Sequence, residues 1–400
     1  MPFLRTQRTS IVLDKKTIML RGVNLGGWLM MEGYFMHSAN VAEQVFKKKF
    51  AKALGKKALR DFEKRFRDNF IREEDVRNIA RLGFNCLRLP FHYRLIETKP
   101  FTYDRRGLAY LDRAIRWARK YRLWVILDLH AAPGAQNHDW HSDSLGKAGL
   151  WDSQSYQRRT LALWELLADR YKNETAVAGY DVLNEAVTDN IRTLNMFYRN
   201  VIRAIRKHDK NHIVFIEGNQ WAQDLECLAD FDDDNWAMSL HYYEPLDFSF
   251  NFVPQLRYPW KTAKGKFNRN DIQRRIGSCR AIARKRGVPV LVGEFGINAR
   301  AGLYNEDIYL RDVLACFAKA GFHWTYWTYK AVKNSIFPDG IYSYYANPPW
   351  VHRQGPLTGW DNYAACWPKQ RQAMCRSWRT KEFQANTEVL KVLRKAAKAS

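Results

Sequence analysis

The sequence predicts an α/β fold in which eight parallel strands close into a barrel that helices surround. Short apolar runs of strand length alternate with longer segments that carry apolar residues at helical spacing. Most of these apolar runs end in a polar or charged residue, which is typical of the mouth of a parallel barrel. The chain has 400 residues, a length that α/β barrels reach as one domain. We therefore expect residues 1–400 to form a single (β/α)8 domain, a TIM barrel.

The N-terminal residues 10–20 alternate between apolar and polar side chains around Asp14-Lys15-Lys16, a pattern typical of a β-hairpin. We expect this hairpin to cap the floor of the barrel. Residues 19–25 then form the first barrel strand, which ends at Gly26-Gly27-Trp28.

Residues 41–70 are rich in lysine and arginine and have apolar residues at helical spacing. We expect a helical excursion on one loop, with its charged face in water. A basic amphipathic helix could also contact a membrane surface. The apolar positions are Val45, Phe46, Phe50, Leu54, Leu59, Phe62 and Phe66.

From residue 73 onward the alternation is regular. The expected helices cover residues 73–82, 104–121, 154–171, 191–207, 270–286, 307–320 and 381–395. The expected strands cover residues 84–89, 123–129, 178–183, 212–216, 236–240, 288–292 and 323–328. The alternative is an open doubly wound sheet, but this chain has no glycine-rich phosphate-binding turn after its first strand. Residues 330–378 are expected to form a long loop after the last strand, where long loops usually shape a site.

The charge of the chain is strongly positive, with 65 basic and 41 acidic side chains and a net charge of +24. Such a charge favours anionic partners, and an anionic cell-surface polymer is one that the basic surface could bind. No signature of a DNA- or RNA-binding module is present, so we do not expect nucleic acid as a partner. A solvated basic surface is the simplest interpretation. No stretch is long and apolar enough to be a transmembrane segment.

The six cysteines form no C-x-x-C pair, which argues against a zinc ribbon or a thioredoxin-like site. Cys366 and Cys375 could pair in a C-terminal loop, but their spacing does not decide this. The N-terminus has no apolar signal region. We therefore expect a cytoplasmic protein, or a secreted one if a signal peptide has been removed.

Polar side chains follow nearly every predicted strand at the same end. Glu185 follows residues 179–184, and Glu294 follows residues 288–293. Because the carboxyl ends of parallel barrel strands meet at one face, these two acids can face each other across the mouth. The other strand ends carry Asn24, Trp28, Glu32, Arg88, His130, Asn184, Glu217, Asn219, Trp221, His241, Tyr243, Trp327 and Lys330.

Two facing carboxyl groups are the arrangement that glycoside hydrolysis uses. In a retaining mechanism, one carboxylate attacks the anomeric carbon, and the other protonates the leaving oxygen and then activates water. The nucleophile has to stay ionised, which Arg88 could ensure through a charge-assisted hydrogen bond. The acid has to hold a proton near neutral pH, so we expect apolar or like-charged neighbours to raise its pKa.

Other residues of this face suit the recognition of a sugar. Asn184 could hydrogen-bond the sugar 2-hydroxyl, and Tyr243 could orient the nucleophile. Trp327 could form a flat apolar floor for the sugar ring, since tryptophan offers such a surface at low entropic cost. In the loop of residues 138–144, Trp140 and Asp143 could bind sugar hydroxyls. We expect the same site to include Glu32, His130, His241 and Trp221.

A metal cluster of His130, His138 and His141 is an alternative interpretation of these residues. No H-E-x-x-H helix accompanies them, and a mechanism with two carboxyl groups needs no metal. We therefore expect neither a metal nor a cofactor.

The order and strand positions of these residues resemble glycoside hydrolase family 5, a cellulase-like family of clan A. The resemblance covers roughly residues 20–330. It implies that Glu185 is the acid/base and Glu294 the nucleophile, with retention of configuration. The residues that carry the resemblance are Arg88, His130, Asn184, Glu185, His241, Tyr243, Glu294 and Trp327.

The N-terminal motifs resemble more narrowly the exo-β-1,3-glucanase branch of that family. These motifs are residues 21–28 followed by Glu32, and residues 54–58 leading to residues 71–75. In that branch, the acid that matches Glu32 holds the terminal glucose and closes the cleft into a pocket. Residues 138–144 and 338–345 depart from that branch.

The resemblance implies a retaining β-glycosidase for β-glucans or β-glucosides, of the exo-acting β-1,3-glucanase or β-glucosidase type. An endo-β-1,4-glucanase, a mannanase and a glycolipid glycosidase stay open. A different class of function is a non-catalytic barrel that binds carbohydrate or an anionic polymer. The presence of both acids argues against a barrel that only binds carbohydrate. Binding that falls steeply with salt would indicate a barrel that binds an anionic polymer.

Overall fold

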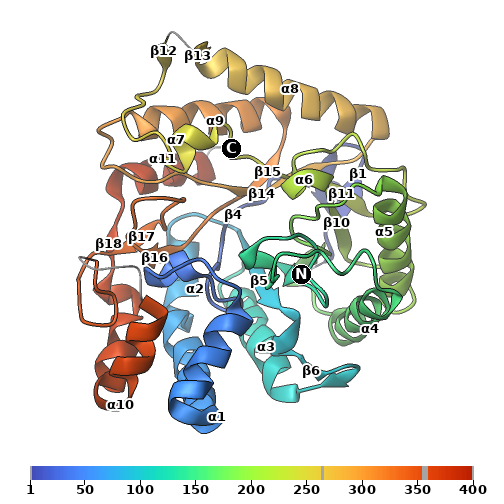
Figure 1. The fold of residues 1–400 in the computed structure, drawn as a ribbon. Helices are drawn as coiled ribbons and strands as arrows, with labels where there is room; N and C mark the ends of the chain where they lie inside the picture. Colours follow the sequence, from blue (N-terminus) through green and yellow to red (C-terminus); the bar gives the residue numbers. More distant parts are fainter. Residues whose placement is uncertain (1, 263–264, 354–358, 399–400) are drawn as a thin grey trace.

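The computed structural model describes residues 2–262, 265–353 and 359–398, and its centre is a closed barrel of eight parallel strands (Figure 1). The barrel closes where Trp324 in the last strand pairs with Arg21 in the first. This closure confirms the predicted fold and excludes the open doubly wound sheet. The barrel strands are β4 (Arg21–Asn24), β5 (Cys86–His92), β8 (Trp124–Ala131), β9 (Val177–Asp181), β10 (Ile213–Glu217), β11 (Trp236–His241), β14 (Val290–Phe295) and β15 (His323–Tyr326).

Helices cover the outside of the barrel, so the strands β5, β8, β9, β10, β11, β14 and β15 are buried along their whole length. The apolar faces of the helices pack on the strands, as helical spacing predicts. These helices are α2 (Glu73–Arg81), α3 (Arg105–Lys120), α4 (Gln154–Tyr171), α5 (Ile191–Arg206), α8 (Arg269–Arg286), α9 (Glu306–Ala320) and α11 (Thr387–Lys398). The first six agree with the predicted ranges to within one residue.

The N-terminal cap is a small antiparallel sheet rather than a single hairpin. It consists of β1 (Arg5–Gln7), β2 (Ser10–Leu13) and β3 (Lys16–Ile18). Asp14 and Lys15 form the predicted turn with φ of 49° and 68°, which suits the twist of a two-residue hairpin. Leu4 and Ile11 are buried against the beginnings of the barrel strands, so this sheet covers the barrel floor.

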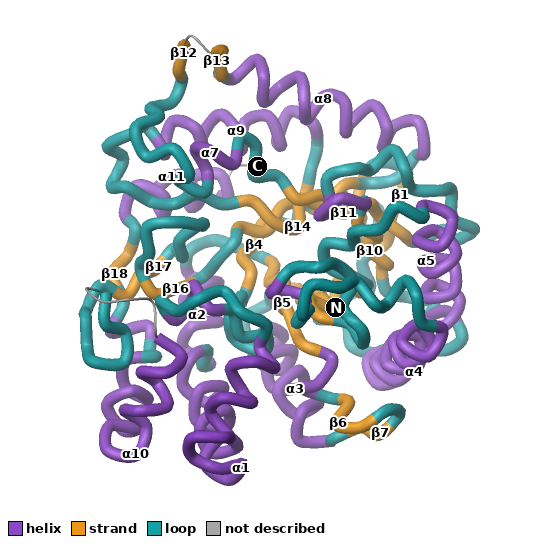
Figure 2. The backbone as a smooth tube through the Cα atoms, viewed as in Figure 1, coloured by secondary structure: helices purple, strands orange, loops and turns teal. Residues whose placement is uncertain are grey.

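The predicted helical excursion is α1 (Glu43–Phe70), which bends at Gly55, where φ is 85°. Its apolar face is covered by α10 (Gly359–Ser377), which lies beside it in both backbone views (Figure 2). Phe62, for example, contacts Trp367 of α10 edge to face at 5.0 Å. The apolar face that a membrane would need is therefore buried inside the protein. Among the described residues, no helix combines the length and the apolar character needed to span a bilayer.

The prediction of a long loop over residues 330–378 is wrong. This segment contains β16 (Lys330–Val332), β17 (Tyr342–Tyr344) and α10, because its aromatic residues form the partner surface for α1. The last helix also begins later than predicted, at Thr387. Before it, η4 (Thr380–Glu382) forms a turn and β18 (Gln384–Ala385) pairs with β17.

Several short elements lie on the loops. They are the hairpins β6 (Glu97–Lys99) with β7 (Thr102–Tyr103) and β12 (Trp260–Thr262) with β13 (Gly265–Phe267), the helical turns η1 (Gly33–Met36), η2 (Tyr93–Leu95) and η3 (Trp140–Ser142), and the short segments α6 (Asn219–Ala222) and α7 (Leu246–Ser249).

All six cysteines are free thiols. Cys366 and Cys375 both lie on α10. Nine residues along one helix correspond to a rise of about 13 Å, which is too far for a disulfide.

Candidate active site

Arg88 lies at the centre of the barrel mouth and is fully buried. Burial alone would lower the pKa of its guanidinium, but surrounding carboxylates raise that pKa well above its usual range. A buried cation requires such compensation. Its partners are Asp181 Oδ2 at 2.9 Å, Glu217 Oε1 at 2.9 Å, Glu294 Oε1 at 2.8 Å, Asp128 Oδ2 at 3.2 Å, Asn184 Oδ1 at 2.9 Å and Asn24 Oδ1 at 3.1 Å.

Glu294 lies near the end of β14 and has a donor on each of its carboxylate oxygens. Arg88 donates to Oε1, and the Tyr243 hydroxyl donates to Oε2 at 2.9 Å. Burial, followed by the charge of Glu294, raises the pKa of Tyr243 well above its usual range. The phenol therefore stays protonated and acts as a donor. Together these two donors fix the orientation of the Glu294 carboxylate.

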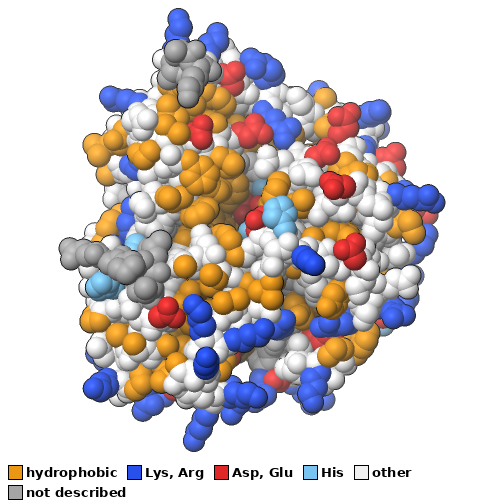
Figure 3. All heavy atoms as spheres, in the orientation of Figure 1, with side chains coloured by type: hydrophobic (Ala, Val, Ile, Leu, Met, Phe, Trp, Pro, Cys, Tyr) orange, Lys and Arg blue, Asp and Glu red, His pale blue; other side chains and the backbone are white. Residues whose placement is uncertain are grey.

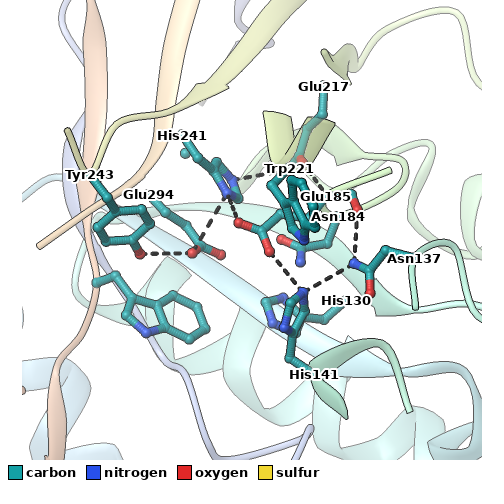
Figure 4. Close-up of polar contacts among 12 residues, drawn as sticks. His130, Asn137, His141, Asn184, Glu185, Glu217, Trp221, His241, Tyr243 and Glu294 are labelled. Atoms are coloured by element: carbon teal, nitrogen blue, oxygen red, sulfur yellow. Dashed lines mark hydrogen bonds and ion pairs between the residues drawn. The ribbon is translucent and has the colours of Figure 1, made fainter. Parts of the chain in front are cut away.

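Glu185 follows β9 in a left-handed backbone conformation, with φ of 50°, which is uncommon outside glycine. Its backbone N–H donates to Glu217 Oε2 at 2.5 Å, and its carbonyl accepts from Asn137 Nδ2 at 2.8 Å. These contacts hold the unusual conformation, which turns the side chain into the mouth. There, Oε1 lies 2.8 Å from His241 Nδ1, and Oε2 lies 2.9 Å from His141 Nε2 (Figure 4).

The environment of Glu185 differs from the one that the sequence predicts for an acid. Burial alone would raise its pKa, but the hydrogen bonds with His141 and His241 hold it well below the usual range. The pKa values of both histidines are raised instead. Burial alone would lower the pKa of each imidazole. For His141, the contact with Glu185 outweighs burial. For His241, the charges of Glu217 and Glu294 are the main effects that outweigh it. The proton closest to Glu185 is therefore held on the neighbouring imidazoles.

The carboxylates of Glu185 and Glu294 lie close to each other. One oxygen of each, together with a ring nitrogen of His241, fall within 4.8 Å of one another. Nδ1 of His241 lies 2.8 Å from Glu185 and 3.7 Å from Glu294 Oε2. The imidazole thus separates two acids that belong to different strands.

A flat surface lies beside these acids, where the rings of His130 and Trp327 stack at 5.3 Å with an interplanar angle of 6°. Nε2 of His130 lies 3.7 Å from Glu32 Oε1, and Trp327 Nε1 donates to the Tyr34 hydroxyl at 2.5 Å. Glu32 is only 4% exposed. Burial, followed by the charges of Glu294 and Glu185, raises the pKa of Glu32 well above its usual range.

Two tryptophans complete the wall of the mouth. Trp140 is half-buried on η3 and contacts Tyr34 edge to face at 6.1 Å. Trp221 is half-buried on α6, and its Nε1 donates to Asp139 Oδ2 at 2.7 Å. Figure 3 shows a hollow in this face, with acidic and histidine side chains at its base and hydrophobic side chains along one wall.

The structure brings the predicted site residues together with the exception of Asp143, whose carboxylate contacts His92 at 3.0 Å and accepts from the Gln44 N–H at 2.7 Å instead. Direct contacts with Arg88, Glu185 or Glu294 are made by Asn184, His241 and Tyr243. His130, Trp327 and Glu32 form the adjoining surface, and Trp140 and Trp221 lie at the edge.

The model of the cellulase family (glycosyl hydrolase family 5) matches residues 48–333. The chain belongs to glycoside hydrolase family 5. A β-xylosidase of Phanerodontia chrysosporium is 34% identical over 348 residues, which are 83% of this chain and 71% of that protein. Endoglucanase C of Acetivibrio thermocellus is 27% identical over 349 residues, which are 79% of this chain and 92% of that protein. A glucan 1,3-β-glucosidase of Blumeria graminis is 32% identical over 253 residues, which are 60% of this chain and 58% of that protein.

Solved structures share the fold of this family 5 chain. Thermotoga maritima Cel5A, a mutant form in complex with cellobiose, aligns with a TM-score of 0.63 at 20% identity, over 94% of this chain and 96% of that chain. The family and its enzyme relatives identify the chain as a glycoside hydrolase, in agreement with the resemblance found in the sequence. They differ among themselves in substrate, so they leave the substrate of this family 5 member open.

The metal cluster considered as an alternative is not present in the described part of the chain. His138 does not join the other two histidines in a group of ligand atoms; its side chain is 52% exposed and contacts Trp221 edge to face. The groups of acids and histidines that do converge are Glu185, His241 and Glu294, and Asp128, Asp181 and Glu217. Arg88 already contacts all three carboxylates of the second group.

Sequence reasoning missed three members of this family 5 site and considered a fourth, His141, only as a metal ligand. Asp128 lies two residues before His130 on the same face of its strand, so the period of two could have identified it. Asp181 interrupts an otherwise apolar strand, which is a similar signal. The contacts of Asn137 and His141 with Glu185 depend on the course of an irregular loop, which no periodic pattern encodes. Asp128, Asp181, Asn137 and His141 are these four residues.

Proposed function

We propose that this protein is a retaining β-glycosidase that hydrolyses β-glucans or β-glucosides, with Glu294 as the nucleophile and Glu185 as the acid/base. The observation that carries the proposal is the approach of the two carboxylates, whose oxygens lie within 4.8 Å. Retaining enzymes hold their carboxyl groups about 5–5.5 Å apart, whereas inverting enzymes need about 6.5–9.5 Å to accommodate a water molecule.

The reaction proceeds in two displacements. Glu294 attacks the anomeric carbon, and the bond to the leaving oxygen breaks as that oxygen takes a proton through Glu185. Water then attacks the glycosyl-enzyme bond, gives its proton to Glu185 and releases the sugar with its original configuration. Arg88 and Tyr243 keep the Glu294 carboxylate aimed at the anomeric carbon.

Several buried polar atoms in the mouth have no hydrogen-bond partner among the described residues, and two of them suit a sugar. These two atoms are Nδ2 of Asn184 and Oε1 of Glu32. Buried polar atoms are normally paired, so substrate hydroxyls are their natural partners. Asn184 would donate to the 2-hydroxyl next to the reacting carbon, a contact that strengthens in the transition state.

The position of Glu32 supports exo action. Its side chain is buried beside His130, next to the flat surface that His130 and Trp327 form. A buried carboxyl group at this position can bind the terminal hydroxyls of a sugar, and we propose that it blocks a continuing chain. The glucan 1,3-β-glucosidase relative fits this proposal. The β-xylosidase and endoglucanase relatives keep a β-xyloside and an endo-acting glucanase as alternatives.

Product analysis would test this proposal on laminarin, cello-oligosaccharides, mannan and aryl β-glycosides. We expect glucose from laminarin with the β-anomer formed first, and no product with Glu294→Ala. Glu226→Ala is the matched control, because Glu226 is exposed and its backbone carbonyl contacts Arg286 at the end of α8. Mixed oligomers would indicate an open cleft and contradict exo action. Activity in Glu294→Ala, or the α-anomer as first product, would contradict the mechanism itself.

We also propose that the basic surface of α1 binds an anionic polysaccharide of a cell surface. No acid occurs between residues 44 and 60, and among the described residues no ion-pair partner lies near the exposed cations there. Basic side chains gather in Figure 3 along the lower edge of the molecule, where α1 lies in Figure 1. The second half of α1 differs, since Lys64, Arg65 and Arg67 pair with acids on the same helix. The unpaired cations are Lys48, Lys49, Lys52, Lys56, Lys57 and Arg60.

Binding to a sulfated polysaccharide, measured as a function of salt, would test this surface. We expect the affinity to fall steeply with salt, and substitution of Lys48, Lys52, Lys56 and Lys57 by glutamine to weaken binding and flatten this dependence. The control replaces Lys391 and Lys395 of α11 in the same way. Equal binding by the α1 variant and the control variant would contradict the proposal.

A further inference from the structure

We propose that His141 shares a proton with Glu185 and connects this acid/base residue to solvent. His141 is thus a positioning residue that acts through Glu185, and its role rests on the function proposed above. Nε2 of His141 lies 2.9 Å from Oε2 of Glu185, the oxygen that His241 does not contact (Figure 4). Glu185 therefore has one histidine on each oxygen, and the two histidines differ in their surroundings.

The loop around His141 is held rigidly. Gln136 is fully buried and donates to the carbonyls of His130 and Asn184, each at 2.8 Å. The Ser142 hydroxyl lies 3.0 Å from the Asn137 carbonyl. Because these contacts join the loop to β8 and to the end of β9, the imidazole is placed against Glu185 before any substrate binds.

Asn137 adds a contact that favours release of the proton from His141. Its Oδ1 accepts from the Asp139 N–H at 2.9 Å, so its Nδ2 faces the Glu185 carbonyl at 2.8 Å and His141 Nε2 at 3.1 Å. When Glu185 is ionised, Nε2 carries the proton and donates to Oε2. When Glu185 is protonated, Oε2 donates to the single lone pair of the neutral Nε2, and the N–H donors of His141 and Asn137 no longer oppose each other. The proton can therefore move without a displacement of the heavy atoms.

His241 is less suited to this exchange, although it also contacts Glu185. Its side chain is 1% exposed, and its Nε2 lies 3.2 Å from Glu217 Oε1, while its Nδ1 lies between Glu185 and Glu294. Loss of its proton would remove a cation from among three carboxylates. The His141 side chain is 15% exposed. The charged groups that act on it are Glu185, Asp139 and Glu294, and they raise its pKa against the effect of burial.

The proposed exchange balances over one turnover. In the first displacement, the Nε2 proton of His141 passes to Glu185 as Glu185 protonates the leaving oxygen, and the glycosidic C–O bond breaks. His141 is then neutral and Glu185 is ionised. In the second displacement, the attacking water gives a proton to Glu185, which returns it to Nε2. One water is consumed, and its atoms are divided between the sugar and the leaving alcohol.

The substitution His141→Gln would test this role, since glutamine keeps a donor near Oε2 but cannot hold an exchangeable proton. Two substrates with the wild-type enzyme's preferred sugar are compared by kcat/KM, which reports the first displacement. We expect the value for an alkyl glycoside to fall at least about 30-fold, below the full effect of a general acid. For the 2,4-dinitrophenyl glycoside, whose leaving group needs no proton, we expect less than about a threefold change.

The pH profile provides a second readout that a structural role would not move. In the wild type, the basic limb for the alkyl glycoside follows loss of the proton that His141 and Glu185 share. In His141→Gln, a carboxyl group alone holds this proton, so the limb should move to lower pH by at least about one unit. His138→Gln is the control on the same loop, because its ring does not contact Glu185. We expect this control to keep the wild-type profile.

The outcomes separate this inference from the proposed function. Equal losses on both substrates with an unmoved pH profile would reduce His141 to a structural residue, and wild-type behaviour would also overturn the inference. If Glu185→Gln hydrolysed the alkyl glycoside normally, the acid/base assignment itself would fail. Should His141→Gln not fold, NMR titration of His141 in the wild type and in Glu185→Gln decides. The His141 pKa should then be lower by at least about one unit in Glu185→Gln, and an unchanged value would overturn the inference.

Discussion

At the scale of single residues, one guanidinium organises the mouth of the barrel. Arg88 contacts four carboxylates from four different strands, those of Asp128, Asp181, Glu217 and Glu294. Burial, followed by the charge of Glu217, raises the pKa of Asp181 well above its usual range. The site therefore contains more carboxyl groups than one cation can neutralise, and its stability depends strongly on Arg88.

The substitution Arg88→Met should destabilise the protein, because it leaves several buried acids without their cation. Breaking a buried ion pair by removing one partner costs about 3–5 kcal/mol. Denaturant unfolding at neutral pH would measure the loss, with Arg394→Met on the exposed face of α11 as the control. The control should change the unfolding free energy by less than about 0.5 kcal/mol. A small change in Arg88→Met would mean that the acids are protonated in the folded protein.

The substitution Tyr243→Phe should reduce kcat. It removes the hydroxyl that donates to Glu294 Oε2 at 2.9 Å. A hydrogen bond to a charged group contributes about 1.5–3 kcal/mol, which corresponds to a loss of about 10- to 150-fold. Tyr242→Phe is a matched control, since its buried hydroxyl has no hydrogen-bond partner among the described residues. Equal kcat values for the two variants would show that Tyr243 does not orient the nucleophile.

Residues at the ends of strands could be predicted from sequence, and residues on loops could not. Glu185 and Glu294 follow apolar runs, so the barrel pattern alone places them at one face. His141 lies outside any periodic segment, and its contact with Glu185 arises from hydrogen bonds of Gln136 and Asn137. The pKa of Glu185 was predicted in the wrong direction for the same reason. The sequence places His241 at the mouth but does not show that it contacts Glu185, and it suggests His141 only as a metal ligand.

At the scale of elements, α1 and α10 form a helical pair attached to the barrel. The pair is held by aromatic side chains, among them Phe50, Phe62, Trp367 and Trp378. The sequence predicts α1 from its helical spacing, but α10 contains Pro368 in its interior and is rich in aromatic residues. An internal proline argues against a helix, so local propensity favoured a loop there. Packing against α1 outweighs that preference, which is information that only the tertiary structure contains.

The substitution Trp367→Ala should loosen this pair without altering the active site. Trp367 is 3% exposed and contacts Phe50, Phe62 and Trp378, so its removal creates a cavity between the helices. Truncation of a buried tryptophan costs about 3–5 kcal/mol. Denaturant unfolding measures this loss, with Gln372→Ala on the exposed face of α10 as the control. At temperatures where the variant is folded, kcat should equal that of the wild type; a reduced kcat would show that the pair supports the barrel mouth.

At the scale of the whole molecule, closure of the barrel connects the titration of the mouth to global stability. Eight strands meet there, and a group that changes charge in this region changes the free energy of the entire fold. The pKa of Glu185 is lowered on folding, so its contribution is present above the usual glutamate pKa and is lost in acid. The pKa of His241 is raised on folding, so its contribution to stability is complete below the usual histidine pKa and is lost as the pH rises.

The substitution His241→Gln should change how the unfolding free energy depends on pH. In the wild type, the stabilisation from His241 is complete below its usual pKa of 6.5 and declines as the pH rises toward its folded-state value. Each unit by which folding raises the pKa contributes about 1.4 kcal/mol. Because glutamine does not titrate, the decline above that pH should be much smaller in His241→Gln. Denaturant unfolding from about pH 5 to about pH 9 measures both curves.

His208→Gln, at a partly exposed position on the surface, is the control and should keep the wild-type decline. If His241→Gln and the wild type declined in parallel, His241 would be neutral in the folded protein, and the proton next to Glu185 would have to be held by His141 alone.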